Sequence, residues 1–145
     1  EIAEKAMALG LDAVQLHGRV EELDWAKFLP GVFVIRVFHM TPDEEKNAPT
    51  LHDALRPGYH HIILLDTATQ GGQDGGSGVS FNWSHVSNIP VPFLIAGGLT
   101  PDNVQEALTQ SLAAGVDTSS GVETEGQKDT AKITAYVENA RRVLS

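Results

Sequence analysis

The chain has 145 residues, of which 41% are hydrophobic and 20% are charged, a composition typical of a soluble globular domain and not of a disordered one. The formal net charge of -9, with no run of Lys or Arg, argues against binding to nucleic acid or to an acidic membrane surface. The sequence contains no cysteine, no apolar run of about 20 residues and no signal-peptide pattern, which excludes thiol chemistry within these residues and predicts a cytoplasmic protein without a membrane span.

Helices and strands are predicted to alternate along the chain. Apolar residues at helical spacing predict a helix over Glu1–Gly10, with Gly10 as its stop. Runs of apolar residues predict five strands, at Ala13–Leu16, Val32–Phe38, His61–Leu65, Pro92–Ala96 and Gly115–Ser119. Further helices are predicted at Val20–Phe28, Leu51–Leu55, Trp83–Val86, Asn103–Leu112 and Thr130–Leu144. Apolar strands separated by helices indicate an α/β fold with a parallel sheet buried on both faces.

Two helices carry recognisable end signals. Thr100 is a candidate N-cap, and Pro101 suits the first helical position after it. The last helix has Arg141 and Arg142 near its C-terminal end, where the helix dipole favours positive charge. Both are expected to cover the sheet.

The length of the chain limits which α/β fold it can form alone. A closed eight-stranded barrel needs about 200 residues or more, and this chain has 145. Because Glu1–Gly10 reads as a helix that leads directly into a strand, we expect residues 1–145 to be a single partial domain that begins within a larger fold.

Two glycine turns follow the last two predicted strands. Gly97-Gly98 and Ser120-Gly121 each lie between a strand and a helix. In parallel α/β folds ligands bind at the carboxyl ends of the strands, where exposed glycine amides beside a helix N-terminus can hold an anion. The pattern predicts a phosphorylated small-molecule ligand; the alternative is that these glycines only form tight turns.

Two aspartates also follow predicted strands. Asp66 ends an apolar strand, where partial burial would favour a protonated carboxyl able to act as a general acid; otherwise it caps the next turn. Asp117 could accept a hydrogen bond from a substrate N–H or from the backbone inside the fold. The glycine-rich segment 71–78 is either a lid over the site or a solvent loop.

The histidines do not form a recognisable metal site. His17, at a strand end, is expected to be a structural group, and His52, His60 and His61 do not have metal-ligand spacing. No metal is predicted.

An ordered set of motifs resembles those of the phosphoribosylanthranilate isomerases of tryptophan biosynthesis. The motifs are Val14-Gln15-Leu16-His17-Gly18, Leu65-Asp66-Thr67, Gly75-Gly76-Ser77-Gly78 with Phe81 and Trp83, Ala96 to Val104, Val116-Asp117, Ser119 to Glu123, and Gly126 with Lys128-Asp129. Each motif alone is weak evidence for the family, but the motifs occur in the family's order and together cover nearly the whole chain. The resemblance implies a (β/α)8 TIM barrel, of which this chain would supply an incomplete portion, about strands 4 to 8, with Glu1–Gly10 as the end of the third helix.

The resemblance also implies an activity and roles for particular residues. The family's reaction is an Amadori rearrangement that opens the ribose ring of N-(5-phosphoribosyl)anthranilate, without a cofactor. Asp66 matches the family's general acid, and Asp117 matches an aspartate near the substrate's amino group. The family's phosphate site corresponds to Gly97, Gly98, Ser120 and Gly121.

Two functional residues of the family have no counterpart here. They are the general base, a cysteine at the end of strand one, and an arginine that holds the anthranilate carboxylate. We therefore expect this chain by itself to be an inactive portion of an active enzyme. The long segment Thr41–Tyr59 is compatible with fusion to other tryptophan-pathway domains.

Other readings of the sequence remain open. Indole-glycerol-phosphate synthase, another phosphate-handling barrel enzyme, would require a catalytic lysine at a strand end, and none of the five strand ends carries one. A non-catalytic half-barrel could bind anions or serve as an interaction module. An incomplete gene product would leave two sheet edges unpaired and prone to aggregation.

Overall fold

The computed structural model describes residues 1–17, 29–41, 44–55, 61–67 and 81–144, and these form a five-stranded parallel sheet. The elements are α1 (Ile2–Leu9), β1 (Ala13–Leu16), β2 (Phe33–His39), α3 (Glu44–Ala54), β3 (Ile62–Asp66), the 3-10 helix η1 (Trp83–Val86), β4 (Phe93–Ala96), α4 (Val104–Ser111), β5 (Gly115–Val116), the 3-10 helix η2 (Ser120–Val122), the ribbon strands β6 (Glu123–Thr124) and β7 (Gln127–Lys128), and α5 (Thr130–Leu144). The sheet order is β1-β2-β3-β4-β5, so each strand pairs with its neighbours in the sequence.

The five predicted strands and their parallel pairing are confirmed. Both ends of β1, β2, β3 and β4 lie within one residue of the prediction, whereas β5 ends at Val116 instead of at Ser119. The predicted helix Val20–Phe28 and the glycine-rich segment 71–78 lie outside the described residues. Among the described helices, none is both long and apolar enough to cross a membrane.

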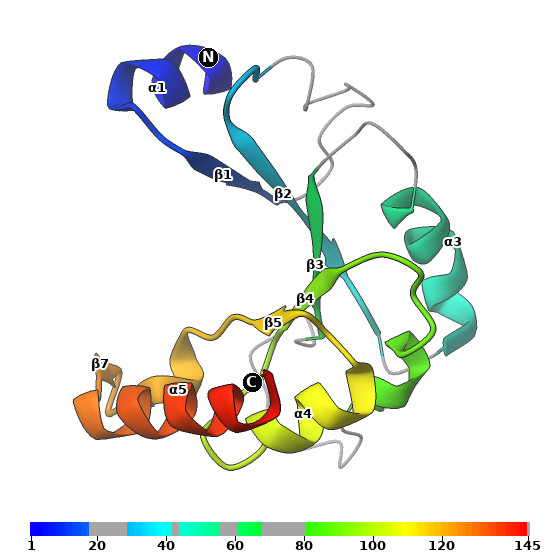
Figure 1. The fold of residues 1–145 in the computed structure, drawn as a ribbon, viewed down its shortest axis with the longest axis vertical. Helices are drawn as coiled ribbons and strands as arrows, with labels where there is room; N and C mark the ends of the chain where they lie inside the picture. Colours follow the sequence, from blue (N-terminus) through cyan, green and yellow to red (C-terminus); the bar gives the residue numbers. More distant parts are fainter. Residues whose placement is uncertain (18–28, 42–43, 56–60, 68–80, 145) are drawn as a thin grey trace.

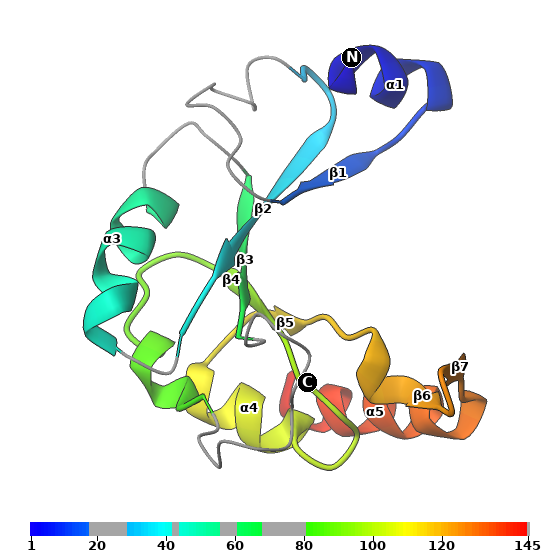
Figure 2. The ribbon, with the colours of Figure 1, turned by 180° about the vertical axis from the view of Figure 1, so that it is seen from behind.

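The two faces of the sheet differ in what covers them. Helices α3, α4 and α5 lie on one side of the curved sheet (Figure 1). The main core fills this side with fully buried residues such as Ile63, Leu65, Ile95 and Leu108. Seen from behind in Figure 2, the concave side carries no described helix.

A smaller apolar cluster lies on the concave face. It consists of buried Val37, Leu64 and Ala96, with Ile35 and Leu94 packed against them. Successive side chains of a strand point to opposite faces, so residues two apart along β2 and β3 share this face. The concave face is therefore apolar below the carboxyl ends of the strands.

The start of α4 differs from the prediction. The helix begins at Val104 with Asn103 at the N-cap position, so the expectation of Thr100 as N-cap with Pro101 as first helical residue is wrong by three residues. The Asn103 side chain explains the shift, because its Oδ1 accepts from the Thr100 amide at 2.8 Å and its Nδ2 donates to the Gly98 carbonyl at 3.0 Å. Asn103 thus ties the helix start to the glycine turn.

The other helices follow the sequence with one extension. Helix α1 ends at Gly10, whose φ of 61° is the left-handed geometry expected of a glycine stop. Helix α3 is longer than the predicted Leu51–Leu55, since it begins at Glu44 and continues through Pro49. A proline inside a helix removes one backbone donor, which is why the sequence signal for this helix is weak.

Helix α5 begins as predicted, after an aspartate cap. The Asp129 carboxylate accepts hydrogen bonds from Thr124 Oγ1 at 2.7 Å and from the Ala131 amide at 2.9 Å. The hydrogen bonds from Thr124 and then from the Lys132 amide lower the pKa of Asp129. The same contacts attach the β6-β7 ribbon to the helix.

Helix α4 ends on an unusual residue, and this gives a stability prediction. Leu112 occupies the C-cap with φ of 58° and is 70% exposed. A left-handed conformation costs a residue with a Cβ about 1 kcal/mol or more, and glycine avoids that cost. We expect Leu112→Gly to raise the free energy of unfolding by about 0.5–1 kcal/mol, measured by urea denaturation. Thr109→Gly, inside the same helix, should instead lower the free energy of unfolding. A destabilising Leu112→Gly would contradict the prediction.

Candidate functional site

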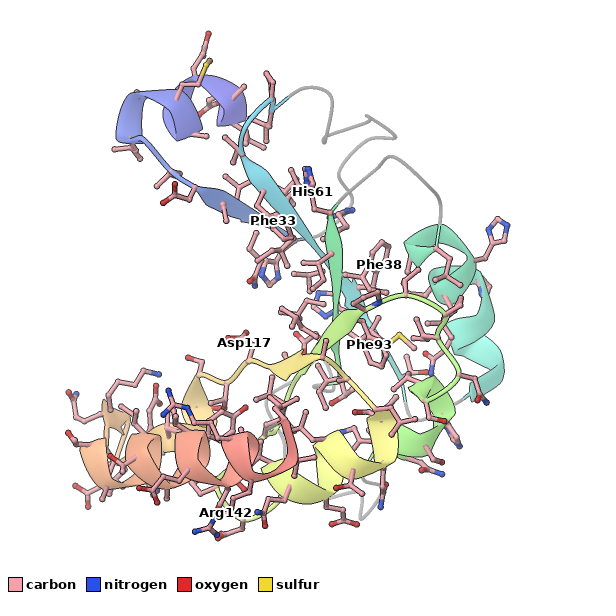
Figure 3. All side chains as sticks on the ribbon, in the orientation of Figure 1. Phe33, Phe38, His61, Phe93, Asp117 and Arg142 are labelled. Atoms are coloured by element: carbon pink, nitrogen blue, oxygen red, sulfur yellow. The ribbon has the colours of Figure 1, made fainter. Side chains whose placement is uncertain are left out.

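The carboxyl ends of the strands bring the predicted polar residues to one face. The register pairs His39 with Asp66 and Asp66 with Ala96, and the Asp117 amide donates to the Ile95 carbonyl at 2.9 Å. Alternation along the strands then puts His39, Asp66 and Asp117 on the concave face, above the apolar cluster. In Figure 3 Asp117 points to the side opposite α4 and α5.

Asp66 lies at the centre of this edge. Its side chain is 20% exposed, and its Oδ2 lies 3.4 Å from Nδ1 of His39, whose side chain is 40% exposed. The Asp66 carbonyl accepts from the Met40 amide at 2.8 Å, which fixes the ends of β2 and β3 together. The partial burial expected from the sequence is therefore present, with a histidine as a direct neighbour of the carboxyl.

Thr67 connects the end of β3 to the first glycine turn. Its hydroxyl donates to the Ala96 carbonyl at 2.9 Å and to the Gly97 carbonyl at 3.1 Å, and its amide also donates to Ala96 at 2.9 Å. Thr67 is buried, so these bonds are protected from water. The position of the Gly97-Gly98 turn is thereby set relative to Asp66.

The Gly97-Gly98 turn has a backbone that favours glycine. Gly97 has φ of 94° and Gly98 has φ of 63°. Their carbonyls accept from Thr67 and Asn103, whereas their amides donate no hydrogen bond to any described residue. Two consecutive free amides in this geometry can bind an anion.

The second glycine turn packs directly on the first. A Cβ on Gly121 would lie 1.7 Å from the Leu99 carbonyl oxygen, and Thr118 Oγ1 donates to the same oxygen at 2.7 Å. The amides of Ser120 and Gly121, at the start of η2, likewise donate to no described residue. The two turns singled out in the sequence are thus neighbours in space, and their free amides lie at one end of the sheet.

The β6-β7 ribbon holds the second turn from the other side. Lys128 Nζ donates to the Ser119 carbonyl at 2.9 Å and to Ser119 Oγ at 3.1 Å. The same ammonium contacts Glu123 Oε1 at 2.6 Å. This lysine was quoted in the sequence only as part of a motif, and its contacts give it a role in fixing the turn.

Besides burial, the charge of Asp117 affects the pKa of Tyr136, a buried tyrosine of α5. Burial, followed by the nearby charge of Asp117, raises the pKa of Tyr136 well above its ordinary value. The Tyr136 hydroxyl is buried and has no hydrogen-bond partner among the described residues. Asp117 itself is exposed, so its carboxylate is accessible from the concave face.

His17 and His61 each contact residues other than Asp66. His17 is exposed, contacts Gln15 Nε2 at 2.9 Å, and its ring centroid lies 6.4 Å from that of His39. His61 accepts from the Val34 amide at 3.0 Å and stacks on Phe33 at 4.9 Å, near the amino end of the strands (Figure 3). Within the described ranges no three His, Cys, Asp or Glu side chains are grouped so as to hold a metal ion.

Three residues with structural roles at this edge were missed in the sequence. They are His39, Thr67 and Asn47, a buried asparagine that exchanges hydrogen bonds of 2.8 Å with the backbone of Thr41. The signal for His39 was its place at a strand end, since extending the apolar run by one residue sets it beside Asp66. Thr67 stands in the motif Leu65-Asp66-Thr67 but was given no role of its own, and Asn47 has no signal in the sequence beyond its residue type.

The chain matches a family model and proteins of known structure along nearly its whole length. Residues 1–139 match the model described as N-(5'phosphoribosyl)anthranilate (PRA) isomerase. An N-(5'-phosphoribosyl)anthranilate isomerase from Eremothecium gossypii is 40% identical over 99% of this chain and 68% of that protein. The isomerase structure from Pyrococcus furiosus superposes with a TM-score of 0.75 at 29% identity, over 99% of this chain and 70% of that one.

Other relatives are much longer than this chain. A multifunctional tryptophan biosynthesis protein from Schizosaccharomyces pombe is 44% identical over 89% of this chain but only 15% of its own length. The isomerase from Wickerhamomyces anomalus is covered over 53% of its length. The chain thus spans between a small part and about two thirds of these curated relatives.

Proposed function

The chain belongs to the N-(5'-phosphoribosyl)anthranilate isomerase family, and we propose that it carries the general acid and the phosphate site of that isomerase in tryptophan biosynthesis. The observation that carries the proposal is the position of Asp66 at the carboxyl edge of the sheet, paired with Ala96 just before two adjoining glycine turns whose amides donate to no described residue. A family structure of similar fold, with a TM-score of 0.72, is titled as a complex with reduced 1-(o-carboxyphenylamino)-1-deoxyribulose 5-phosphate.

The sheet is proposed to be part of one barrel domain. In this proposal residues 1–145 form a single partial (β/α)8 domain, β1 to β5 correspond to barrel strands 4 to 8, and α1 corresponds to the end of the third helix. Support comes from the sequential parallel strand order and from the order of the family motifs along the chain. The helices on the convex face match the outer layer of such a barrel.

The proposed reaction starts with a proton from Asp66. The protonated carboxyl gives its proton to the ring oxygen of the ribose as the bond from C1 to that oxygen breaks, and the amine lone pair forms the C=N bond. A base then removes the proton from C2, giving an enamine that tautomerises to the ketone. The amides of Gly97, Gly98, Ser120 and Gly121 bind the phosphate, and Asp117 accepts from the anthranilate N–H.

The general base is proposed to come from outside these 145 residues. The family uses a cysteine, and this sequence contains none. Multifunctional tryptophan biosynthesis proteins of Schizosaccharomyces pombe and Phycomyces blakesleeanus are among the relatives, which supports a fusion with other pathway domains. We also propose a cytoplasmic location, which suits a phosphorylated metabolite, and a reaction without a cofactor.

Complementation tests the proposed function. The loss of phosphoribosylanthranilate fluorescence is followed with the chain alone and with the chain mixed with the N-terminal third of a family member. We expect turnover only in the mixture, because acid and base then meet in one site. A verified folded complex that binds phosphate but shows no turnover would reject the isomerase in favour of an anion-binding half-barrel.

A further inference from the structure

We propose that His39 is a positioning residue for the proposed acid, which it orients through Nδ1 and reloads with a proton from solvent after each turnover. The inference rests on the proposed function of Asp66 and adds to it a second residue and a route for the proton. It is based on a side-chain pair at the ends of two neighbouring strands, β2 and β3.

The pair is built into the strand register. His39 and Asp66 are the last residues of β2 and β3 and are direct partners in the ladder, with Nδ1 and Oδ2 separated by 3.4 Å. The Met40 amide donates to the Asp66 carbonyl at 2.8 Å, so neither strand end can slide without breaking a backbone bond. The imidazole is therefore held beside the carboxyl by the sheet itself.

The backbone beyond His39 is also fixed. Asn47 is 2% exposed, and its side chain accepts from the Thr41 amide and donates to the Thr41 carbonyl, both at 2.8 Å. Both polar groups of a buried amide are satisfied by a single residue two positions after His39. These two hydrogen bonds fix the backbone just after β2, and the bond from the Met40 amide fixes it to β3. The contact between His39 and Asp66 therefore lies between two fixed segments of backbone.

Exposure increases from the acid to the histidine. The Asp66 side chain is 20% exposed and that of His39 is 40% exposed. An acid that is covered by substrate during the reaction loses direct access to bulk water. A neighbour that contacts the acid and remains open to solvent provides a path for the returning proton.

Few other titratable groups face His39. Among the described residues these are Asp66 at the end of β3 and His17, which follows β1 and whose ring centroid lies 6.4 Å away at a tilt of 47°. Asp117, which follows β5, shares the concave face three strands away from β2. Arg36 is on the same strand, but alternation turns it to the other face, where Nη1 donates to the Leu16 carbonyl at 3.1 Å. Helix α3 packs on that other face as well.

The proton balance of the proposed cycle is closed. Asp66 gives its proton to the ring oxygen and becomes a carboxylate. Protonated His39 then donates the Nδ1 proton to Oδ2, which restores the carboxylic acid and leaves a neutral imidazole. Water or buffer acid returns the proton to His39, and the base that took the C2 proton releases it to solvent, so no net proton is consumed.

Two substitutions separate orientation from proton supply. In the complemented enzyme, His39→Asn keeps a donor near the place of Nδ1 but supplies no acidic proton, whereas His39→Ala removes both the donor and the proton. We expect both His39→Asn and His39→Ala to lower kcat by about 10- to 100-fold with little change in KM, less than the loss on removing a direct acid. Added imidazole should raise the kcat of His39→Ala toward the native value and should leave the kcat of the native enzyme unchanged. His52→Asn, at an exposed histidine of α3, is the matched control and should behave as native.

The possible outcomes separate a failure of the role of His39 from a failure of the proposed isomerase function. Full activity in His39→Asn with a loss in His39→Ala would reduce His39 to a hydrogen-bond donor, and native kcat in both variants would exclude any role. Inactivity of the native complex would instead reject the proposed function. A readout without turnover tests the pair separately: the ring 15N chemical shifts of His39 should change on Asp66→Asn, and unchanged shifts would overturn the contact.

Discussion

Asp66→Asn should lower kcat of the complemented enzyme by about 10²- to 10⁴-fold, the range expected for loss of a general acid. The amide has nearly the shape of the carboxyl, and the backbone bond from the Met40 amide to the Asp66 carbonyl is unaffected. The side chain is 20% exposed, so the neutral amide is not left unsatisfied in a dry interior. The loss should therefore fall on kcat, while KM and the urea midpoint change little. Initial rates of fluorescence loss measure kcat and KM, and urea denaturation measures the midpoint.

Asp12→Asn provides the matched control for this prediction. Asp12 is exposed and precedes β1 at the amino end of the strands, where its carbonyl accepts from the Phe33 amide at 2.8 Å. The substitution makes the same change of charge far along the strands from the proposed site. We expect native kinetics. A similar loss in both variants would assign the effect to net charge, and an active Asp66→Asn would require a different acid.

The fold was predictable because burial leaves a strong pattern. Runs such as Ile62 to Leu65 are apolar at every position, as expected of a strand that is buried on both faces. Helices between successive strands then favour parallel pairing. The failures came where local chemistry decides a boundary. Helix α4 begins later than predicted because the Asn103 side chain bonds to the preceding turn. Helix α3 is longer than predicted because it contains Pro49, a residue that usually ends a helix.

The candidate site was predictable only to the level of which strand ends carry it. Asp66 and the two glycine turns were identified because parallel strands place their carboxyl ends at one edge. Which of these groups touch depends on register and on turn geometry, neither of which the sequence records. The contact between His39 and Asp66 needs the ladder, and the packing of Gly121 on Leu99 needs the path of two loops.

Gly121→Ala should disrupt the proposed phosphate site through a backbone clash. The new Cβ would lie 1.7 Å from the Leu99 carbonyl oxygen and 2.8 Å from its carbon, and neither atom belongs to a side chain that can rotate away. Relief requires the two turns to separate, which would move apart the amides of Gly97, Gly98, Ser120 and Gly121, none of which donates to a described residue. We expect a loss of about 1–3 kcal/mol or more in the free energy of unfolding. KM should rise at least about 10-fold, which corresponds to about 1.4 kcal/mol of lost binding.

Gly126→Ala separates this clash from the general cost of replacing a glycine. Gly126 has φ of 75° but nothing within 4 Å of an added Cβ, whereas Gly121 is not among the glycines with positive φ. Alanine at 126 should cost about 1 kcal/mol in stability from its conformation alone and leave KM unchanged. Binding of inorganic phosphate, followed by calorimetry on the folded variants, reports the same difference without turnover. If Gly121→Ala kept native KM and phosphate affinity, the amides of these two turns would not form the phosphate site, and the glycines would serve only to pack the loops.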